Sequence, residues 1–295
     1  MFTLAHLSDP HLAPLPKPRW RELIGKRMTG YVKWLRRRRF IHDADVLAKI
    51  VADVKAQAPD HIAVTGDLSN IALEEEFERG RKWLQEMGSL RDVSYVPGNH
   101  DAYVPKAVRY APRWAPYMSA DDGAVGFPYL RRRGPLALIG LSTAVATAPF
   151  MATGWLGEAQ LGRLGAMLDA LAGEKVFRVV LVHHPPVSQA GHHKRLIDAA
   201  QFLRVIATQG AELVLHGHDH VHMLNWLAGP DGARVPALGV PSASAAPGMS
   251  KDAAAYNLYA VGGAPGAWTC EMISRGMSRA GDVMELNRMK LLELG

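Results

Sequence analysis

The sequence contains a single cysteine, Cys270, among 295 residues. One cysteine cannot form a disulfide within the chain, and it cannot supply the paired thiolates of a structural zinc site. A chain of this length with 48% hydrophobic residues can bury a sizeable core without either kind of cross-link. We therefore expect a protein of a reducing compartment that depends on packing alone for its fold.

Long apolar runs and a leader sequence are also lacking. No stretch of eighteen consecutive apolar residues occurs, so the sequence predicts no membrane-spanning helix. The first residues, MFTLAHLSDPHL, have no basic region, no apolar core of signal-peptide length and no small-residue cleavage site. We expect a cytoplasmic location, with peripheral contact at the inner membrane surface as the open alternative.

The sequence has no net positive charge outside one segment. Lys17 to Arg39 holds ten lysines or arginines and one acid, Glu22, which gives +9, whereas the whole chain carries +6 and the remainder therefore −3. A mildly acidic body without a separate DNA-binding module argues against a nucleic acid partner. Internal repeats and linkers are absent as well, so we expect one domain over residues 1–295. The basic segment would be an insertion at about 14–42, and a C-terminal extension would begin at about 276 and run to 295.

The sequence does contain a recurring pattern, an apolar strand-like run that ends in polar side chains able to bind metal. It occurs in TLAHLSDPH, HIAVTGD, VSYVPGNHD, FRVVLVHHPP and LVLHGHDH. Between these runs lie amphipathic segments of helical period, Asp43–Gln57, Leu73–Met87, Gly157–Leu171 and Leu196–Ala207. Strands that alternate with helices predict an α/β fold with largely parallel strands, and ligands collect at the carboxyl ends of such strands. We expect the five polar endings to meet there.

Beyond His222 the pattern changes to short strand-like runs separated by Gly/Pro turns. These runs are Leu224–Leu227, Val235–Val240, Tyr256–Val261 and Trp268–Ile273. We expect them to form an antiparallel extension of a second sheet, and we expect a helix from Asp282 to Leu292.

The polar endings offer two aspartates, one asparagine and several histidines as metal ligands, without a thiolate. The candidates are Asp9, His11, Asp67, Asn99, His183, His218 and His220. Oxygen and nitrogen donors of this kind suit Mn, Fe, Co or Zn rather than a calcium cage or an iron–sulfur cluster. Donor chemistry does not choose among these four metals.

The ordered motifs resemble the signature of the calcineurin-like metallophosphoesterases, in particular the bacterial class III branch of cyclic-nucleotide and glycerophosphodiester phosphodiesterases. The matching blocks are Asp9-x-His11, Gly66-Asp67, Gly98-Asn99-His100-Asp101, His183 and Gly217-His218-Asp219-His220. The resemblance implies a four-layer α/β/β/α sandwich, with two mixed β-sheets flanked by helices. It also implies two divalent metal ions per chain, drawn from Mn, Fe, Zn or Co.

The same resemblance implies a role for each ligand. Asp9, His11 and His220 would hold one metal, Asn99, His183 and His218 the other. Asp67 would bridge them, because its two oxygens can each face a cation. Two adjacent metals can clamp a phosphoryl group, whose P–O bond would be cleaved by attack of a metal-bound hydroxide. His100 would be catalytic, stabilising the developing charge or protonating the leaving oxygen, with Asp101 orienting its ring.

Other histidines lie close to these motifs. We expect His216 and His222 to pack or to support the ligands from behind. His183 is preferred to His184 as the ligand because it follows its strand directly. His192 and His193 lie in the loop after HHPP, where contact with substrate and solvation both stay open.

The basic segment carries an apolar stripe at helical spacing, which Gly25 and Gly30 weaken. The stripe consists of Trp20, Leu23, Ile24, Met28, Tyr31 and Leu35. Three hypotheses follow. The segment is a cap with a solvated basic face, a cationic lid that attracts a phosphorylated substrate, or a surface helix that docks residues 17–39 on anionic lipid.

These observations favour a metal-dependent phosphodiesterase with a phosphodiester substrate. The alternative is a membrane-surface pyrophosphatase acting on a UDP-linked lipid of the UDP-2,3-diacylglucosamine type, although that family often has arginine where this chain has His100. A nuclease ranks lower because the body is acidic. A non-catalytic scaffold ranks lower because every ligand position is filled.

Overall fold

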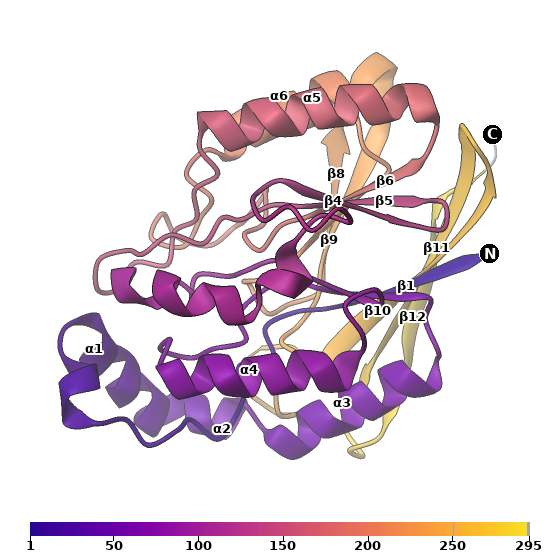
Figure 1. Ribbon diagram of the computed structural model, residues 1–295. Coiled ribbons are helices and arrows are strands. Elements are labelled where there is room, and N and C mark those ends of the chain that lie inside the picture. The colour runs from indigo at the N-terminus through magenta and orange to yellow at the C-terminus, as the bar shows by residue number, and fades with distance from the viewer. Residues whose placement is uncertain (250, 294–295) are drawn as a thin grey trace.

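Two six-stranded mixed β-sheets lie face to face between two layers of helices in the computed structural model, which describes residues 1–249 and 251–293 (Figure 1). Helices α3 (Ala44–Ala56) and α4 (Glu74–Met87) cover the outer face of one sheet. Helices α5 (Glu158–Glu174) and α6 (Ala199–Gln209) cover the outer face of the other. The four layers confirm the predicted α/β/β/α sandwich, and each amphipathic segment forms a helix within a few residues of its expected ends.

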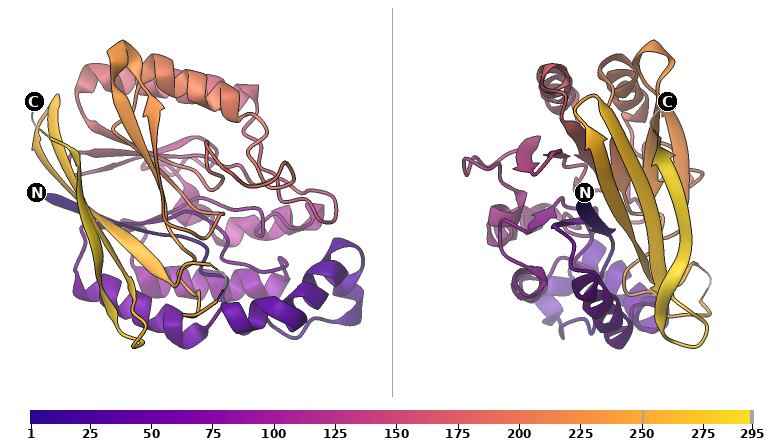
Figure 2. Two further views of the ribbon diagram at one scale, coloured as in Figure 1. Left: turned by 180° about the vertical axis from the view of Figure 1, so that it is seen from behind. Right: turned by 90° about the vertical axis from the view of Figure 1, so that its right-hand side faces the viewer.

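The first sheet has the strand order β12-β11-β10-β1-β2-β3. Its parallel half consists of β1 (Phe2–Leu7), β2 (His61–Val64) and β3 (Val93–Tyr95). Its antiparallel half consists of β10 (Ala255–Ala264), β11 (Ala267–Met277) and β12 (Val283–Leu292), the long yellow and orange strands of Figure 2. Two predictions are wrong here. The runs of β10 and β11 extend the first sheet rather than the second, and the expected helix over 282–292 is a strand because it pairs with β11 along its length.

The second sheet has the strand order β4-β5-β6-β7-β9-β8. Its strands are β4 (Tyr129–Arg133), β5 (Leu136–Gly140), β6 (Phe177–Leu181), β7 (Leu213–His216), β8 (Met223–Ala228) and β9 (Arg234–Gly239). The antiparallel pair β8–β9 joins this sheet through a parallel contact between β9 and β7. Short 3-10 turns occur at η3 (Pro105–Arg113), η4 (Ala115–Met118) and η5 (Pro230–Gly232).

Side chains of the central strands alternate between two apolar environments. In β6, Phe177, Val179 and Leu181 belong to the core that also contains Leu4 of the first sheet. Val180, between them, packs with the apolar side chains of α5 and α6. Because successive side chains of a strand point to opposite faces, the whole strand is buried. The carboxyl end of β6 is therefore held firmly in place.

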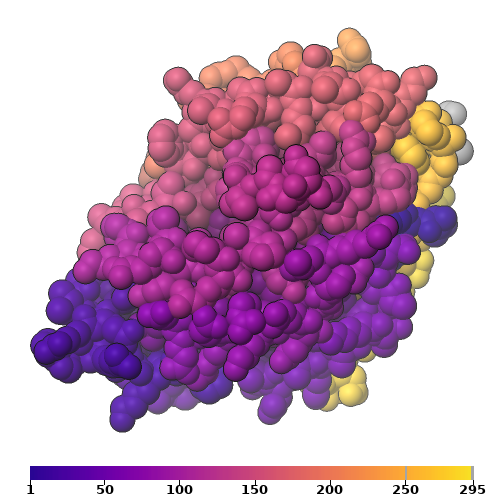
Figure 3. Space-filling model, in the orientation of Figure 1, coloured from indigo at the N-terminus to yellow at the C-terminus, as the bar shows by residue number. Residues whose placement is uncertain are grey.

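The basic insertion folds into short helical turns against the body. It comprises η1 (Trp20–Leu23), α1 (Lys26–Lys33), the π-helical turn η2 (Trp34–Arg38) and α2 (Arg39–Ile41). Arg27 is buried and donates hydrogen bonds to the carbonyl oxygens of Ile71, at 3.0 Å, and Ala72. Gly30 approaches Tyr103 so closely that a Cβ would lie 2.5 Å from the phenol oxygen. In Figure 3 the insertion, in indigo, forms one end of the molecule. No described helix is long and apolar enough to cross a membrane.

Candidate metal centre

The five polar endings meet at the carboxyl ends of β1, β2, β3, β6 and β7. Backbone hydrogen bonds join the loops within each sheet, as from Asp9 N to Gly66 O at 3.0 Å and from Gly217 N to His183 O at 3.0 Å. A third bond crosses between the sheets, from the His218 N–H to Asp9 Oδ2 at 2.9 Å. Residues that are far apart in the sequence are thereby fixed around one buried point.

One group of donors contains Asp9, His11 and His220. The Asp9 Oδ1 atom lies 3.0 Å from His220 Nε2, and His11 Nε2 lies 3.4 Å from the same nitrogen. One donor atom from each of the three residues falls within 4.8 Å of the other two. Asp9 and His11 are completely buried. This is the set that the family resemblance implies for one metal.

A second group lies on the other side of Asp67. His183 Nε2 is 3.2 Å from Asn99 Oδ1 and 3.4 Å from Asp67 Oδ2. Asp67 Oδ2 is also 3.8 Å from His11 Nε2, so this carboxylate stands between the two groups. The nearby Nε2 atom of His218 is buried without a hydrogen-bond partner in the part of the chain that the structure describes. Such an unpaired nitrogen is costly unless a further ligand occupies its lone pair.

Backbone carbonyls orient two of the histidine rings. His11 Nδ1 lies 3.1 Å from Ser69 O, and His183 Nδ1 lies 2.7 Å from Thr65 O. When Nδ1–H donates to a carbonyl, Nε2 is left as a lone-pair donor, an arrangement common behind metal-binding histidines. Both nitrogens of His184 instead contact protein groups, Thr143 Oγ1 at 2.7 Å and Ala152 O at 3.1 Å. The geometry favours His183 over His184 as a ligand.

The backbone at this site adopts conformations that L-amino acids rarely take. Five candidate ligands have positive φ angles: Asp9 (51°), His11 (38°), Asp67 (56°), His218 (69°) and His220 (55°). Left-handed backbone at non-glycine residues costs free energy and clusters at functional sites. The adjoining Gly217 is required by space, because a Cβ would lie 1.9 Å from Ser8 Oγ and 2.4 Å from Asp9 Oδ2. The loops are thus shaped to direct these side chains inward.

The buried carboxylates of the site require compensating positive charge. Burial opposes ionisation of Asp67, but the neighbouring His183 lowers the pKa of its carboxyl group below the ordinary value. Burial also lowers the pKa of His183, yet the charges of Asp67 and Asp9 outweigh this and raise it to about 10. Buried carboxylates that draw a proton onto an imidazole are well suited to divalent cations, which supply the same charge. The residues present therefore fit the metals that the sequence implies.

His100 and Asp101 lie beside the donors, and the structure corrects one detail of their relationship. The backbone N–H of His100 donates to Asp67 Oδ1 at 2.7 Å, and its ring nitrogen Nδ1 contacts Asn70 O. The carboxylate of Asp101 accepts hydrogen bonds from the N–H groups of Asp67 (2.9 Å) and Ser69 (3.0 Å). Asp101 therefore holds the loop of Asp67, and Asn70, not Asp101, orients the His100 ring.

Two residues at the site carry no motif and were missed from the sequence. Arg38 is contributed by the insertion, and its guanidinium nitrogens lie 3.2 Å from His100 Nδ1 and 3.1 Å from His11 Nε2. His42 is buried with its ring centroid 4.4 Å from that of His11. Because Arg38 donates to the nitrogen expected to bind metal, a metal at His11 requires that contact to be released. The only sequence signal was the run of four arginines, which does not say which one turns inward.

A cavity of about 440 Å³ opens beside the donors. Asp67, Asn99, His100, His218 and His220 form its inner end. His193 also lines it, whereas His192 is exposed and is not among the lining residues. Outside the cavity, His216 is completely buried and His222 is exposed.

Comparison with known proteins gives the following similarities. Residues 2–222 match the model of the calcineurin-like phosphoesterase family. The chain is 32% identical over 179 residues to a probable cyclic nucleotide phosphodiesterase of Synechococcus sp., covering 59% of this chain and 62% of that protein. It is 30% identical over 148 residues to the glycerophosphodiester phosphodiesterase GpdQ of Enterobacter lignolyticus, and this alignment covers 49% of this chain and 48% of that protein. These alignments span less than two thirds of either relative. Among solved structures, a dimetal phosphatase from Danio rerio shares the fold, with a TM-score of 0.60 and 14% sequence identity. The superposition covers 97% of this chain and 98% of that one.

Proposed function

The chain belongs to the calcineurin-like phosphoesterase family, and from this premise we propose that it is a dinuclear metal-dependent phosphodiesterase. The observation that carries the proposal is the position of Asp67, whose Oδ2 atom lies 3.8 Å from His11 Nε2 and 3.4 Å from His183 Nε2. One carboxylate between two groups of donors is the arrangement that a pair of bridged cations requires.

The proposed ligands divide between the two cations as the sequence motifs indicate. Asp9, His11 and His220 hold one, Asn99, His183 and His218 hold the other, and Asp67 is shared. The metals are Mn, Fe, Zn or Co, and when bound they polarise the phosphoryl group and lower the pKa of coordinated water. The chain supplies the remaining contacts. His100 and Arg38 line the cavity beside Asp67, where the guanidinium can donate hydrogen bonds to phosphate oxygens, and the His100 ring can do so through Nε2 when it is protonated.

A phosphodiester substrate is supported by the names of the two curated relatives, which act on cyclic nucleotides and glycerophosphodiesters. We expect Mn-loaded protein to hydrolyse bis-p-nitrophenyl phosphate with a kcat/KM roughly tenfold or more above that for p-nitrophenyl phosphate. EDTA should abolish both activities, and added Mn²⁺ should restore them. The kcat/KM values for cyclic nucleotides, glycerophosphodiesters and a UDP-linked lipid then show which natural class of substrate is preferred. A preference for the monoester would contradict the diesterase assignment.

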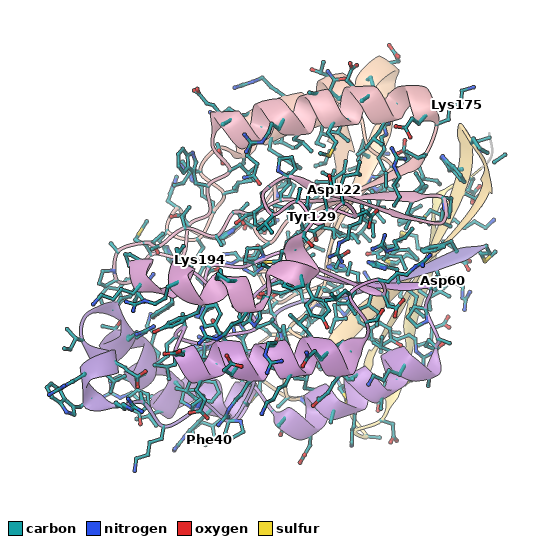
Figure 4. The ribbon with its side chains drawn as sticks, in the orientation of Figure 1. Phe40, Asp60, Asp122, Tyr129, Lys175 and Lys194 are labelled. Atoms are coloured by element: carbon teal, nitrogen blue, oxygen red, sulfur yellow. The ribbon has the colours of Figure 1, made fainter. Side chains whose placement is uncertain are left out.

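A second candidate function is favoured by the surface of the insertion. Trp20 and Ile24 are 72% and 71% exposed, and Phe40, labelled in Figure 4, is 58% exposed. Large apolar side chains among arginines and lysines suit the surface of an anionic membrane. This combination supports a pyrophosphatase that works on a UDP-linked lipid at the cytoplasmic face of a membrane.

Membrane contact can be tested without removing the insertion, whose Arg27, Leu23 and Trp34 are buried. We expect the double substitution Trp20→Ser and Ile24→Ser to lower binding to phosphatidylglycerol vesicles roughly tenfold or more, because each side chain would otherwise leave water. The measurement is vesicle sedimentation, with phosphatidylcholine vesicles for comparison. Leu90→Ser, at an exposed site away from the insertion, is the matched control. Equal sedimentation of the wild type and the double variant would remove the support for a lipid substrate.

A further inference from the structure

The cavity beside the metal centre is lined by more positive charge than one phosphodiester requires. Six cationic side chains and two carboxylates line it. The cations are Lys26, Lys33, Arg37, Arg38, Lys194 and Lys251, and the carboxylates are Asp67 and Asp252. A phosphodiester carries a single negative charge, and Arg38 already lies at the inner end beside His100. The four lysines of the cavity therefore have no anionic group to bind in the substrate unless it carries further negative charge.

The lysines of the cavity form two like-charged pairs, Lys26 with Lys33 and Lys194 with Lys251. Lys26 and Lys33 come from α1, and burial together with the charge of Lys33 lowers the pKa of Lys26 to about 8. Lys194, labelled in Figure 4, comes from the loop between β6 and α6, and it lowers the pKa of Lys251 in addition to burial. Like charges at close range destabilise a fold. A cleft lined by one sign of charge attracts ligands of the opposite sign.

Within the described part of the chain, no carboxylate forms an ion pair with these four lysines. Its ion pairs between basic side chains and carboxylates involve other cations, for example Arg113 with Glu74 and Glu78, or Arg275 with Asp53. Lys26, Lys33, Lys194 and Lys251 take part in none of them within residues 1–249 and 251–293. The charges of the cavity lysines are therefore not balanced by a directly bonded carboxylate, although Lys26 and Lys251 donate to neutral oxygens.

Lys26 is held in position at the mouth of the cavity. Its ammonium donates to Thr147 Oγ1 at 2.7 Å and to Met151 O at 3.1 Å, which leaves one of its three N–H groups for a ligand. It also lies 4.6 Å from the centre of the Tyr103 ring, and that ring stacks on His100 with 5.3 Å between centroids. One aromatic ring thus separates the Lys26 charge from the imidazole at the inner end.

We propose that the substrate carries a second phosphate, or a comparable anionic group, which Lys26 and Lys33 bind beside Tyr103 while the phosphodiester lies at the metal centre. The assignment of the reacting diester rests on the proposed function. The position of the second phosphate is inferred only from the lysines. The proposed substrate class is therefore a phosphodiester with an additional phosphate, and about the width of one aromatic ring separates the two phosphates.

The test uses two esters that differ only in the second phosphate: the p-nitrophenyl ester of thymidine 5′-phosphate, and the same ester with a 3′-phosphate. For the wild-type protein we expect a KM roughly tenfold or more lower for the 3′-phosphorylated ester, because charge-assisted hydrogen bonds to phosphate are strong. In Lys26→Met the ratio of the two KM values should approach one. The ratio is taken within one variant, so a general loss of activity cancels.

Two controls accompany this comparison. Lys26→Arg keeps the charge and should keep most of the preference, and Lys55→Met removes an exposed lysine of α3 and should leave the ratio unchanged. Equal KM values in the wild type would overturn the proposal. A preference that survives in Lys26→Met but is lost in Lys194→Met would place the second phosphate at Lys194 and overturn the assignment to Lys26.

A binding measurement separates this proposal from the proposed function. Calorimetry on the full chain, with and without Mn²⁺, compares thymidine 3′,5′-bisphosphate with thymidine 5′-phosphate. We expect roughly tenfold tighter binding of the bisphosphate to the wild type and no difference in Lys26→Met. If neither ester is hydrolysed but this difference is found, the phosphodiesterase assignment fails and the anion site stands. Equal affinities in the wild type refute the anion site whether or not the esters react.

Discussion

Replacing Asp67 by alanine is expected to leave fewer than two metal ions per chain and to lower kcat/KM for bis-p-nitrophenyl phosphate by at least about 10³-fold. The reason is geometric. Asp67 Oδ2 lies 3.8 Å from His11 Nε2 and 3.4 Å from His183 Nε2, so one carboxylate oxygen faces a histidine of each group. Without it the two groups of donors lose the carboxylate that both cations would share.

The measurement is elemental analysis of metal-loaded protein beside steady-state kinetics. Asp169→Asn, at an exposed position on α5, controls for the loss of one acidic residue. Asp67→Asn keeps the shape and an amide oxygen, so it should retain more metal than the alanine variant. Two tightly bound ions in Asp67→Ala would mean that the carboxylate is not shared.

Replacing His100 by alanine is expected to reduce kcat about 10²- to 10³-fold while two metal ions stay bound. The contact of His100 with Asp67 runs through the backbone N–H, at 2.7 Å from Asp67 Oδ1, so truncation of the ring leaves that hydrogen bond in place. The ring itself lines the cavity and contacts Asn70 O through Nδ1, which leaves Nε2 for the substrate.

Leaving groups distinguish the possible tasks of this ring. If His100 protonates the leaving oxygen, the loss in His100→Ala should be larger for glycerol esters than for p-nitrophenyl esters, because p-nitrophenolate leaves without a proton. A uniform loss would indicate charge stabilisation instead. His192→Ala, which alters an exposed loop outside the cavity lining, is the control. Loss of metal from His100→Ala would refute the separation of catalysis from metal binding.

The candidate ligands could be found from the sequence because each of them follows a strand closely. Asp9 lies two residues after the end of β1, and His183 lies two residues after the end of β6. Parallel strands carry their carboxyl ends to one edge, so a polar ending on each strand is enough to predict a common site. The local pattern encodes this part of the structure directly.

The positions of Arg38 and His42 could not be predicted in this way. They depend on how the insertion packs on the body, through the buried Arg27 and the close approach of Gly30 to Tyr103. Neither contact leaves a periodic signal, and Arg38 is one of four consecutive arginines. Long-range packing, rather than local sequence, selects the one that enters the site.

In the final strand, the helix propensity of the local sequence gives the wrong prediction. Residues 283–292 read VMELNRMKLL, rich in side chains that favour helices, yet they form β12. Met284, Leu286 and Met289 are half exposed, while Leu291 is buried. The long β11 offers a row of unpaired backbone groups, and pairing with it outweighs helix propensity.

The strand order limits where this protein can be divided. The family match ends at residue 222, but β1 pairs with β10 and β7 pairs with β9, and both partners come later in the chain. A fragment stopping at 222 would turn β1 and β7 into bare sheet edges with apolar faces, which invite aggregation. All the candidate ligands would be present in such a fragment, but two of the strands that support them would lack a neighbour.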